Sequence, residues 1–536
     1  MTGGELLVDA LRVEGVDTVF GLVGSHITAI YDALHGTPGI RVIDARHEQG
    51  AAYMADGYAR VTGRPGVCLV TAGPGATNTL TAVATAFADS SPVLVIAGQV
   101  PSAWIDRGKG VFHECPDQLG MFRAVSAWHR RAESTLAIPG LVREAIRTLR
   151  EGRPRPAYLE VPCDLLDARV ARPSDPVIQP GAPGRVDRDA LRRAVELLRA
   201  SRAPAVWAGG GVIRSGAGGL LRTLAESLGA PVLMTLGGKG SLPADHPLAV
   251  DYWLPAPPAQ ALLDDSDLVL AVGTRFTSMA TGTWRVRLPR LVQVDIDPAE
   301  IGRNYPVEVG VVGDARAVLG QIQAALAEDH QVVRESRAAA VADARRRVEA
   351  EASTRFADGL ALLRALRTAL DRDAIVVCDI TTLGTLARRY FPVYEPRSFI
   401  CPLGFGTLGS AYPMALGAKA GQPGRQVVAI CGDGSFLFNL QEMAAAVQCE
   451  LGVVAIVVND GGYGAIRDWQ RRHGGGRLIG VDLHTPDFGA LAQAFGALAL
   501  RAKDPAELSE QLGVALRSSR PVLLEVPVTL EHPGFG

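Results

Sequence analysis

The sequence is short of several features that each mark a particular kind of protein. Its 536 residues hold only seven cysteines, an odd number with no C-x-x-C pair, so neither a disulfide framework nor a zinc site is expected. Charge of one sign is not in excess, since 54 Lys and Arg face 56 Asp and Glu, and this balance argues against nucleic acid as a partner. No apolar run approaches the ~18 residues of a membrane span, so no membrane partner is expected.

An export signal is missing too, because the segment after Met1 lacks a basic stretch followed by an apolar one. The cytoplasm is therefore the expected location. What the sequence does have is 48% apolar residues, 60 glycines and enough length to bury sizeable cores. This composition predicts a globular protein with many turns, and about 150 residues per domain predict three or four domains.

Short apolar runs alternate with longer helical patterns along the whole chain. The runs read as buried strands, and they cover residues 16–21, 41–45, 66–70, 92–98, 204–208, 231–236, 268–272, 291–296, 375–378, 426–431, 453–459 and 521–526. Helical patterns lie between them, for example at residues 27–34, 49–61 and 76–88. This alternation predicts an α/β fold built on doubly wound parallel sheets.

Two segments divide the pattern into three blocks. Residues 169–185 are rich in Pro and Gly and read as an extended linker, whereas residues 328–357 are rich in Glu, Arg and Ala and read as a solvated connecting helix. We therefore predict three domains, over residues 1–168, 186–327 and 358–536, of which the first and third could share an architecture.

Two polar segments in the third block each follow an apolar strand. Gly432-Asp433-Gly434-Ser435 follows the first strand, and twenty-four residues separate Gly434 from Asn459-Asp460, which ends the second. The carboxyl ends of parallel strands meet at one sheet edge, so Asp433 and Asp460 are expected to converge there as oxygen ligands for Mg²⁺. The glycines leave backbone N–H groups free for a diphosphate. Each segment alone could be only a turn, but together they favour a metal and diphosphate site.

These segments resemble the thiamine diphosphate signature, in which Gly-Asp-Gly is followed about two dozen residues later by Asn-Asn. One position departs from it, because the second Asn is Asp460. The resemblance implies that Mg²⁺ is bound by Asp433, Asp460 and the Gly462 carbonyl, and that the cofactor is contacted by Gly434, Ser435 and Tyr463.

Residues 41–78 resemble the pyrimidine-binding domain of the acetolactate synthase group. The resemblance implies that Glu48 activates the cofactor by a hydrogen bond to N1′ of the aminopyrimidine, which favours the imino tautomer that removes the C2 proton. Taken alone, Glu48 could simply favour the start of the helix over residues 49–61. The same resemblance implies that Gly73, Pro74 and Asn78 shape the cofactor pocket.

The loop Gly404–Gly409 matches the family segment that holds the aminopyrimidine. The resemblance implies that the Gly406 carbonyl accepts a hydrogen bond from the 4′-amino group and that Leu408 supports the bend between the two rings. Leu408 could also be a core residue. Thr381 and Thr382 fall in the family's other diphosphate-binding turn.

The middle block resembles the central domain of acetolactate synthases at residues 241–248, 266–276 and 295–304. Many of those enzymes bind FAD there. Here Gly209-Gly210-Gly211 is not a G-x-G-x-x-G fingerprint, and Thr277-Ser278-Met279 stands where flavin-binding members typically carry Asp-Asp-Arg. We therefore do not expect FAD to be bound.

The substrate side departs from acetolactate synthases. The opening stretch is closer to benzaldehyde lyase, in which a histidine matches His26, and His113 replaces the family's usual glutamine. Either histidine could exchange a proton with the substrate or could be a satisfied polar core residue. Trp469 matches a tryptophan that shapes the acceptor pocket in acetolactate synthases.

The expected activity is a 2-keto acid decarboxylase and carboligase, acting on a 2-keto acid and a carbonyl acceptor. The alternative is a lyase of the benzaldehyde lyase or 2-hydroxyacyl-CoA lyase type, which cleaves or joins 2-hydroxy ketones. A non-catalytic relative is the third option, and the retained Glu48 and metal residues argue against it. In this family the active site forms between the first domain of one chain and the third of another, which implies a homodimer or homotetramer.

Overall fold

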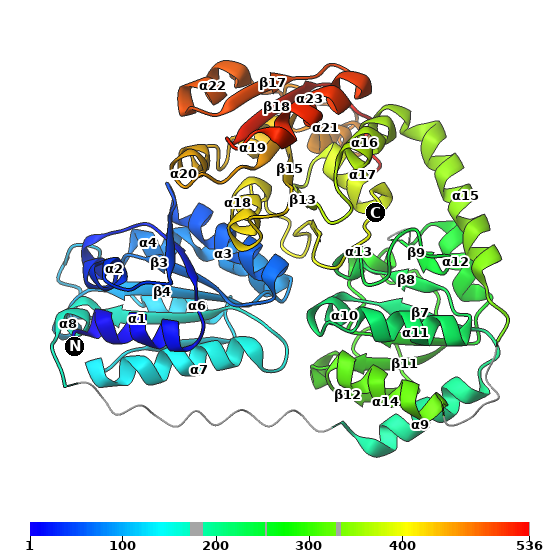
Figure 1. Ribbon diagram of the computed structural model, residues 1–536, viewed down its shortest axis with the longest axis horizontal. Coiled ribbons are helices and arrows are strands. Elements are labelled where there is room, and N and C mark those ends of the chain that lie inside the picture. Colours follow the sequence, from blue (N-terminus) through cyan, green and yellow to red (C-terminus); the bar gives the residue numbers. More distant parts are fainter. Residues whose placement is uncertain (172–185, 252–253, 328–333, 535–536) are drawn as a thin grey trace.

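The computed structural model describes residues 1–171, 186–251, 254–327 and 334–534 (Figure 1). Within them lie three parallel six-stranded sheets with helices on their faces, which confirms the predicted α/β fold. Each sheet with its helices forms a unit, and we call these units the first, central and third domains. The expected linker over residues 169–185 lies largely outside the described residues.

The first domain carries a sheet with the strand order β2-β1-β3-β4-β6-β5. Its strands are β1 (Thr18–Gly21), β2 (Arg41–Asp44), β3 (Gly66–Val70), β4 (Val93–Gln99), β5 (Trp128–Arg131) and β6 (Ala157–Pro162). Its helices are α1 (Gly3–Val13), α2 (Thr28–His35), α3 (Glu48–Thr62), α4 (Pro74–Asn78), α5 (Leu80–Ala88), α6 (Gln118–Arg123), α7 (Ile138–Arg150) and α8 (Cys163–Asp167).

The third domain repeats this strand order as β14-β13-β15-β16-β18-β17, so the two domains share one architecture. Its strands are β13 (Ile375–Cys378), β14 (Phe399–Ile400), β15 (Val427–Gly432), β16 (Val454–Asn459), β17 (Leu498–Arg501) and β18 (Val522–Pro527). Its helices are α16 (Ala357–Ala369), α17 (Thr382–Tyr390), α18 (Ala411–Gly421), α19 (Asp433–Phe436), α20 (Glu442–Gln448), α21 (Gly464–His473), α22 (Phe488–Phe495) and α23 (Pro505–Arg517).

The central domain has the order β12-β11-β10-β7-β8-β9. All its strands are parallel, but the order in which the chain adds strands changes side between β10 and β7, as in a dinucleotide-binding sheet. Its strands are β7 (Pro204–Ala208), β8 (Val232–Met234), β9 (Ala249–Val250), β10 (Leu268–Val272), β11 (Arg290–Asp295) and β12 (Val309–Val312). Its helices are α9 (Arg188–Ala200), α10 (Gly210–Arg214), α11 (Gly218–Leu228), α12 (Pro257–Asp264), α13 (Ser278–Thr281) and α14 (Ala315–Ala327), and α15 (Ala338–Arg355) leads on to the third domain.

The first and third domains pack together through α3 and α18. A Cβ added to Gly57 on α3 would lie 2.0 Å from the Met414 carbonyl oxygen, and one on Gly417 of α18 would lie 1.8 Å from the Met54 carbonyl oxygen. Only glycine allows such an approach of two helix backbones. One hydrophobic cluster consequently runs through both domains, from Phe20 and Tyr53 to Phe436.

Some elements differ from the sequence-based expectation. The helix predicted over residues 76–88 is two helices, α4 and α5, separated at Thr79. The expected connecting helix is present as α15, but it buries one face, with Val341, Ala344 and Val348 on it. None of the described helices is both long and apolar enough to cross a membrane.

Candidate active site

Glu48 is the first residue of α3, at the carboxyl edge of the first sheet. Its Oε2 accepts a hydrogen bond from Asn78 Nδ2 at 2.9 Å, and Asn78 ends α4. The preceding residue, His47, caps the helix by accepting from the Gln49 N–H. Two residues predicted to contact the cofactor, Glu48 and Asn78, are thus brought together, and the Glu48 side chain remains half-buried.

Gly73 and Pro74 form the tight entry into α4. Gly73 has φ +58°, and a Cβ there would lie 2.5 Å from the His113 carbonyl oxygen. Its N–H donates to Gln118 Oε1 at 2.6 Å, and the Gln118 side-chain amide donates in turn to Tyr158 and Glu160. This buried network fixes the turn, and with it the segment that carries His113.

His26 and His113 form a stacked pair with ring centroids 5.0 Å apart, and Phe112 lies beside both rings. His26 is buried, with its Nδ1 3.2 Å from Ser25 Oγ. Burial, and next the neighbouring His113, lowers the pKa of His26, so its neutral form is favoured. His113 has φ +67° and a buried Nδ1 without a hydrogen-bond partner.

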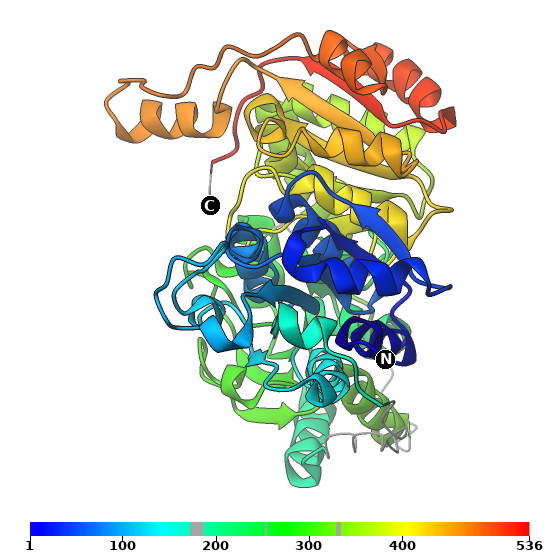
Figure 2. The ribbon, with the colours of Figure 1, turned by 90° about the vertical axis from the view of Figure 1, so that its left-hand side faces the viewer.

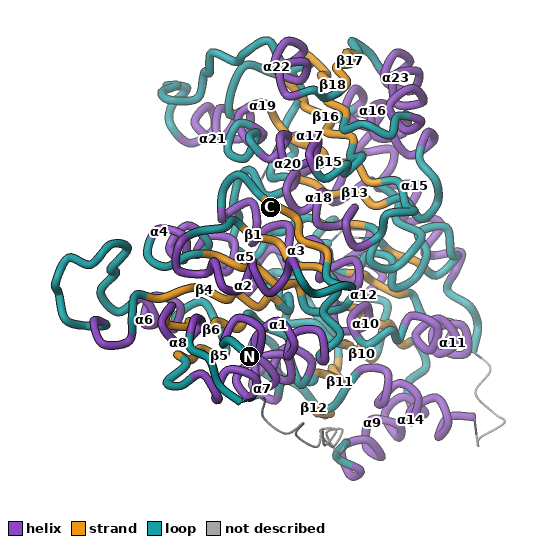
Figure 3. Tube along the Cα trace, turned by 60° about the vertical axis from the view of Figure 1, so that its left-hand side comes forward, coloured by secondary structure: helices purple, strands orange, loops and turns teal. Residues whose placement is uncertain are grey.

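The histidine pair comes from two loops far apart in the sequence. The second of these loops, between β4 and α6, extends from the body of the first domain (Figure 3).

In the third domain, β15 and β16 bring Asp433 and Asp460 together. Asp433 Oδ1 accepts from the Gly434 N–H at 2.8 Å, and its Oδ2 accepts from the Gly462 N–H at 2.9 Å. Burial raises the pKa of Asp460 to about 6, and the nearby Asp433 carboxylate adds to the rise. Arg467 Nη1 lies 3.7 Å from Asp460 Oδ2. Two carboxylates and a glycine-rich backbone therefore share one small space.

Gly434 lies under the ring of Tyr463, because a Cβ at Gly434 would be 2.6 Å from Tyr463 Cε1. The next residue, Ser435, donates through its hydroxyl to Asp379 Oδ2 at 2.8 Å. Asp379 also accepts from the Ser410 N–H and hydroxyl, each at 3.1 Å, so this fully buried carboxylate joins the ends of β13 and β15 to the start of α18. Burial raises the pKa of Asp379 to about 6.

The remaining predicted cofactor contacts of the third domain lie on two more loops. Thr381 caps α17 by accepting from the Gly384 N–H, and Thr382 is the first residue of that helix. Gly406 has φ +75° and is exposed, and Leu408 is partly buried.

The loop that carries Gly406 and Leu408 touches the first domain. Thr407 Oγ1 is 3.2 Å from Thr85 Oγ1, and the Gly404 N–H donates to Asp89 Oδ1 at 3.1 Å. Among the described residues, however, no hydrogen bond joins Glu48 to Gly406 or Leu408 within the one chain.

Trp469 lies on α21, which projects from the third domain (orange in Figure 2). Its side chain is 48% exposed and stacks on His473 with ring centroids 3.9 Å apart. Ile466 and Ile479 are exposed nearby in the sequence. Trp469 therefore lies on the exposed side of this helix, beside His473.

Two charged residues of the site were not found from the sequence. Glu442, at the start of α20, is fully buried and accepts from the Arg46 N–H at 3.0 Å and the His47 N–H at 2.9 Å, just before α3. Arg467 faces Asp460 from α21. The spacing of Glu442, nine residues after Asp433, carries no local signal, because its partners lie almost 400 residues away.

The donor set suits a magnesium ion that also binds phosphate. Among the described residues no group of three or more His, Cys, Asp or Glu side chains is arranged to hold a metal. Two carboxylates and a backbone carbonyl would therefore need oxygen atoms from a ligand or water, which is the usual arrangement for Mg²⁺. The closeness of Asp433 and Asp460 is unfavourable unless a positive charge offsets it.

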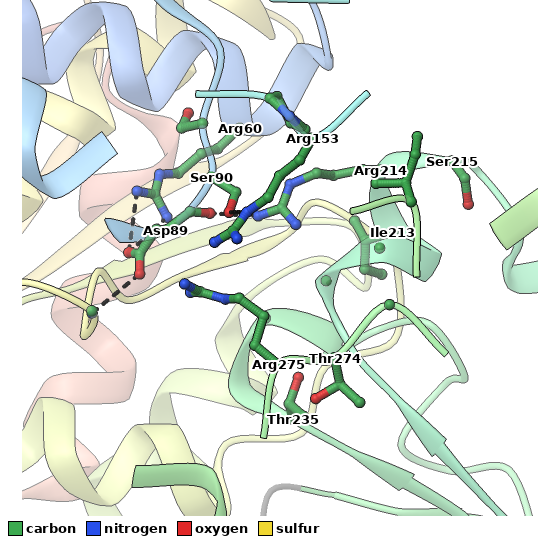
Figure 4. Close-up of a pocket in the computed structure, with 18 of the residues that line it drawn as sticks. Arg60, Asp89, Ser90, Arg153, Ile213, Arg214, Ser215, Thr235, Thr274 and Arg275 are labelled. Atoms are coloured by element: carbon green, nitrogen blue, oxygen red, sulfur yellow. Dashed lines mark hydrogen bonds and ion pairs between the residues drawn. The ribbon is translucent and has the colours of Figure 1, made fainter. Parts of the chain in front are cut away.

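A cavity of about 630 Å³ lies between the three domains, at the carboxyl edge of the central sheet (Figure 4). Arg153, Arg214 and Arg275 point into it. Arg153 pairs with Asp297 and Glu300, whereas Arg214 and Arg275 donate to the backbone carbonyls of Asp89 and Ala88. Burial, and then the neighbouring arginines, lowers the pKa of Arg214 to about 10. Chemically, such a lining suits an anion.

Comparison with known families covers most of the chain. The model of the thiamine pyrophosphate enzyme N-terminal TPP binding domain matches residues 1–121, that of the central domain matches residues 191–322, and that of the C-terminal TPP binding domain matches residues 379–526.

Named relatives align over almost the full length. The chain is 39% identical to "Probable 2-ketoarginine decarboxylase AruI" of Pseudomonas aeruginosa, over 98% of this chain and 94% of the relative. It is 35% identical to "Probable acetolactate synthase large subunit" of Methanocaldococcus jannaschii, over 98% and 92%. It is 34% identical to the acetolactate synthase isozyme 3 large subunit of Escherichia coli, over 98% and 95%. The chain therefore belongs to the thiamine pyrophosphate-dependent enzymes, in the group that resembles acetolactate synthase.

Proposed function

We propose that the chain is a Mg²⁺-dependent enzyme that decarboxylates a 2-keto acid and joins the remaining fragment to a second carbonyl compound. The observation that carries this proposal is the meeting of Asp433 and Asp460 at the ends of β15 and β16 beside Gly434. Relatives named as acetolactate synthases and as a 2-ketoarginine decarboxylase support the same reaction class.

In this proposal the third domain holds the diphosphate end of the cofactor. When bound, thiamine diphosphate supplies a nucleophilic carbon and an electron sink for C–C bond cleavage and formation. The metal would be held by Asp433, Asp460 and the Gly462 carbonyl. The diphosphate would be contacted by backbone and side-chain groups of Thr381, Thr382, Gly434, Ser435 and Tyr463.

The first domain supplies the proton-handling groups. Glu48, held by Asn78, would share a proton with N1′ of the aminopyrimidine, and from the third domain the Gly406 carbonyl would accept from its 4′-amino group while Leu408 would pack against the cofactor. Gly73 and Pro74 would form the wall of this pocket. His26 and His113 would exchange a proton with the substrate oxygen, and Trp469 would border the acceptor.

The reaction is tested by measuring CO₂ release and analysing products with a panel of 2-keto acids, each with and without an aldehyde acceptor. 2-Ketoarginine belongs in the panel because the name of one relative includes it, and pyruvate belongs there as a simple 2-keto acid. CO₂ release with formation of a 2-hydroxy ketone supports the carboligase. If no 2-keto acid releases CO₂, the proposal is wrong.

The lyase alternative draws on one observation, the buried His26 stacked on His113. A neutral imidazole can take the hydroxyl proton of a 2-hydroxy ketone as its C–C bond breaks. Cleavage of an acyloin to an aldehyde, without CO₂ release from any 2-keto acid, would favour this activity over the first.

The metal assignment is tested by Asp433→Ala. We expect this variant to lose Mg²⁺-dependent binding of thiamine diphosphate in a calorimetric titration, because it lacks one of the two carboxylates. Asp358→Asn, which changes an exposed carboxylate at the start of α16, is the matched control and should bind like the parent. Unchanged cofactor binding by Asp433→Ala would remove Asp433 from the metal site.

The central cavity is not expected to hold FAD. Its lining includes Thr277, Ser278 and Met279, which add no charge, whereas its positive charge comes from arginines that suit any phosphate-bearing anion. An absorption spectrum of the purified protein tests this expectation, and a flavin band that persists after gel filtration would contradict it.

The same proposal includes a homodimer or homotetramer, with each active site built by the first domain of one chain and the third domain of another. Its residue limits are those expected from the sequence, 1–168 for the first domain and 358–536 for the third, with 186–327 between them.

A further inference from the structure

We infer that Arg467 is a positioning residue that balances the charge of Asp460 at the proposed metal site. The inference rests on the proposed function, because it takes Asp433 and Asp460 as ligands of Mg²⁺. It concerns a position where this chain departs from the signature it otherwise follows, since Asp460 replaces an amide by a carboxylate.

The guanidinium of Arg467 lies along the loop that carries the proposed ligands. Its Nη1 is 3.7 Å from Asp460 Oδ2, and its Nη2 donates to the Gly461 carbonyl at 3.3 Å and to Asp482 Oδ1 at 3.0 Å. A Cβ added to Gly462 would be 2.4 Å from Nη2, so the side chain lies directly against the loop backbone. It is 11% exposed, and this burial limits the screening of its charge by water.

Arg467 also acts on both carboxylates. Asp433 Oδ2 accepts from the Gly462 N–H at 2.9 Å, and Arg467 Nη2 lies against Gly462, so the guanidinium is close to both carboxylates. Asp482, which Arg467 also contacts, has a side chain that is 76% exposed, so water screens its charge. The partly buried charged groups at the centre are therefore two carboxylates and one guanidinium. Their summed charge equals that of a site with one carboxylate and one amide.

This charge balance predicts opposite effects of the two single changes. Without Arg467, two unbalanced carboxylates attract a divalent cation more strongly. Without the carboxylate of Asp460, the guanidinium remains beside the metal and repels it. Changing both residues restores the balance. A purely structural role of Arg467 predicts a different pattern, in which every variant weakens metal binding and the double variant is the weakest.

The test is calorimetric titration of Mg²⁺ into the full-length protein in the presence of excess thiamine diphosphate. We expect Arg467→Gln to lower the Kd for Mg²⁺ by about tenfold, Asp460→Asn to raise it by about tenfold, and the double variant to lie within about threefold of the parent. Arg472→Gln is the matched control, because Arg472 lies on the same helix but pairs with Asp468. It should leave the Kd unchanged.

The outcomes separate this inference from the proposed function. If the parent protein binds no Mg²⁺, the metal site itself is wrong. If the parent binds Mg²⁺ and Asp433→Ala does not, but Arg467→Gln weakens binding or the double variant fails to recover, the site stands and the role of Arg467 is overturned. Thermal melting of each variant shows whether it is folded, and Arg467→Lys, which keeps the charge, should bind Mg²⁺ within about threefold of the parent.

Discussion

The position of Glu48 depends on contacts with both the first and the third domain. Asn78 donates to its carboxylate from α4, and the N–H groups of the two residues before it, Arg46 and His47, donate to Glu442 of the third domain. The position of its backbone therefore depends on a contact across the domain interface. The side chain itself is half-buried and keeps one carboxylate oxygen for another partner.

We expect Glu48→Gln to slow exchange of the cofactor C2 proton by orders of magnitude while binding of thiamine diphosphate is largely kept. An amide can still accept from Asn78, but it cannot share an acidic proton with N1′. Exchange is followed by NMR in deuterated buffer. Glu133→Gln, which changes an exposed carboxylate of the first domain, is the control. Near-normal exchange in Glu48→Gln would rule out the proposed role.

Packing of α3 on α18 depends on Gly57 and Gly417, where each helix lies against the backbone of the other. We expect Gly417→Ala to destabilise the protein by about 3 kcal/mol, because the new methyl group meets the Met54 carbonyl and the helices must separate. The midpoint of urea denaturation measures the loss.

Gly513→Ala is the matched control for that change. Gly513 is also inside a helix, α23, but the nearest atom to an added Cβ is the flexible end of Arg517 at 3.5 Å. Alanine favours a helix over glycine, so this variant should be as stable as the parent or slightly more stable. Equal behaviour of the two variants would contradict the close approach of α3 and α18.

Glu442, at the start of α20, gives the contact between the two domains a pH dependence. Burial raises its pKa from 4.5 to about 7, even though the Arg46 and His47 N–H groups favour the charged form. Between pH 4.5 and about 7 the folded protein holds this proton and the unfolded chain does not. Stability is therefore lost as the pH rises through this window, by up to about 3 kcal/mol from this group.

We expect Glu442→Gln to remove that dependence, since glutamine keeps an acceptor for the two N–H groups and has no proton to lose. Relative to the parent, the variant should gain stability from pH 5 to pH 8. Thermal melting of both proteins across this range measures the difference. A constant difference in melting temperature would show that Glu442 does not titrate there.

The elements that the sequence reveals best are the central strands. Continuous apolar runs predict β3, β7, β10 and β13 at their observed limits, because these strands are buried on both faces. The short edge strand β14 was not predicted, since two residues beside a loop carry no periodic signal. The break between α4 and α5 was missed because neither glycine nor proline marks it in the stretch Thr77-Asn78-Thr79.

The candidate site shows the same division. Asp433 and Asp460 were predicted to converge because each ends a strand of one sheet, and the structure brings them together. Glu442 and Arg467 were not predicted. The partners of Glu442 lie in another domain, and that contact depends on tertiary packing, which no local pattern encodes. Arg467 is only seven residues from Asp460, but it meets that carboxylate through the irregular loop that leads into α21, which has no periodicity to predict the contact.

At the scale of the whole molecule, the two halves of the proposed site lie in different domains. Glu48 and Asn78 lie in the first domain, whereas the proposed metal ligands lie in the third, and among the described residues no hydrogen bond joins Glu48 to Gly406 or Leu408. A shared active site would unite these halves from two chains. Two inactive variants can then complement each other in a mixed dimer, provided that one is defective in the first-domain half of the site and the other in the third-domain half.

We expect a mixed dimer of one Glu48→Gln chain and one Asp433→Ala chain to recover activity. Co-expression with two different affinity tags and sequential purification isolates it. One of its two sites would combine an intact Glu48 with an intact Asp433 from the other chain, which predicts about half the activity of the parent dimer. Each variant purified alone is the control. If the site were built within one chain, both sites of the mixed dimer would remain defective, so activity no higher than in these controls would contradict the shared site.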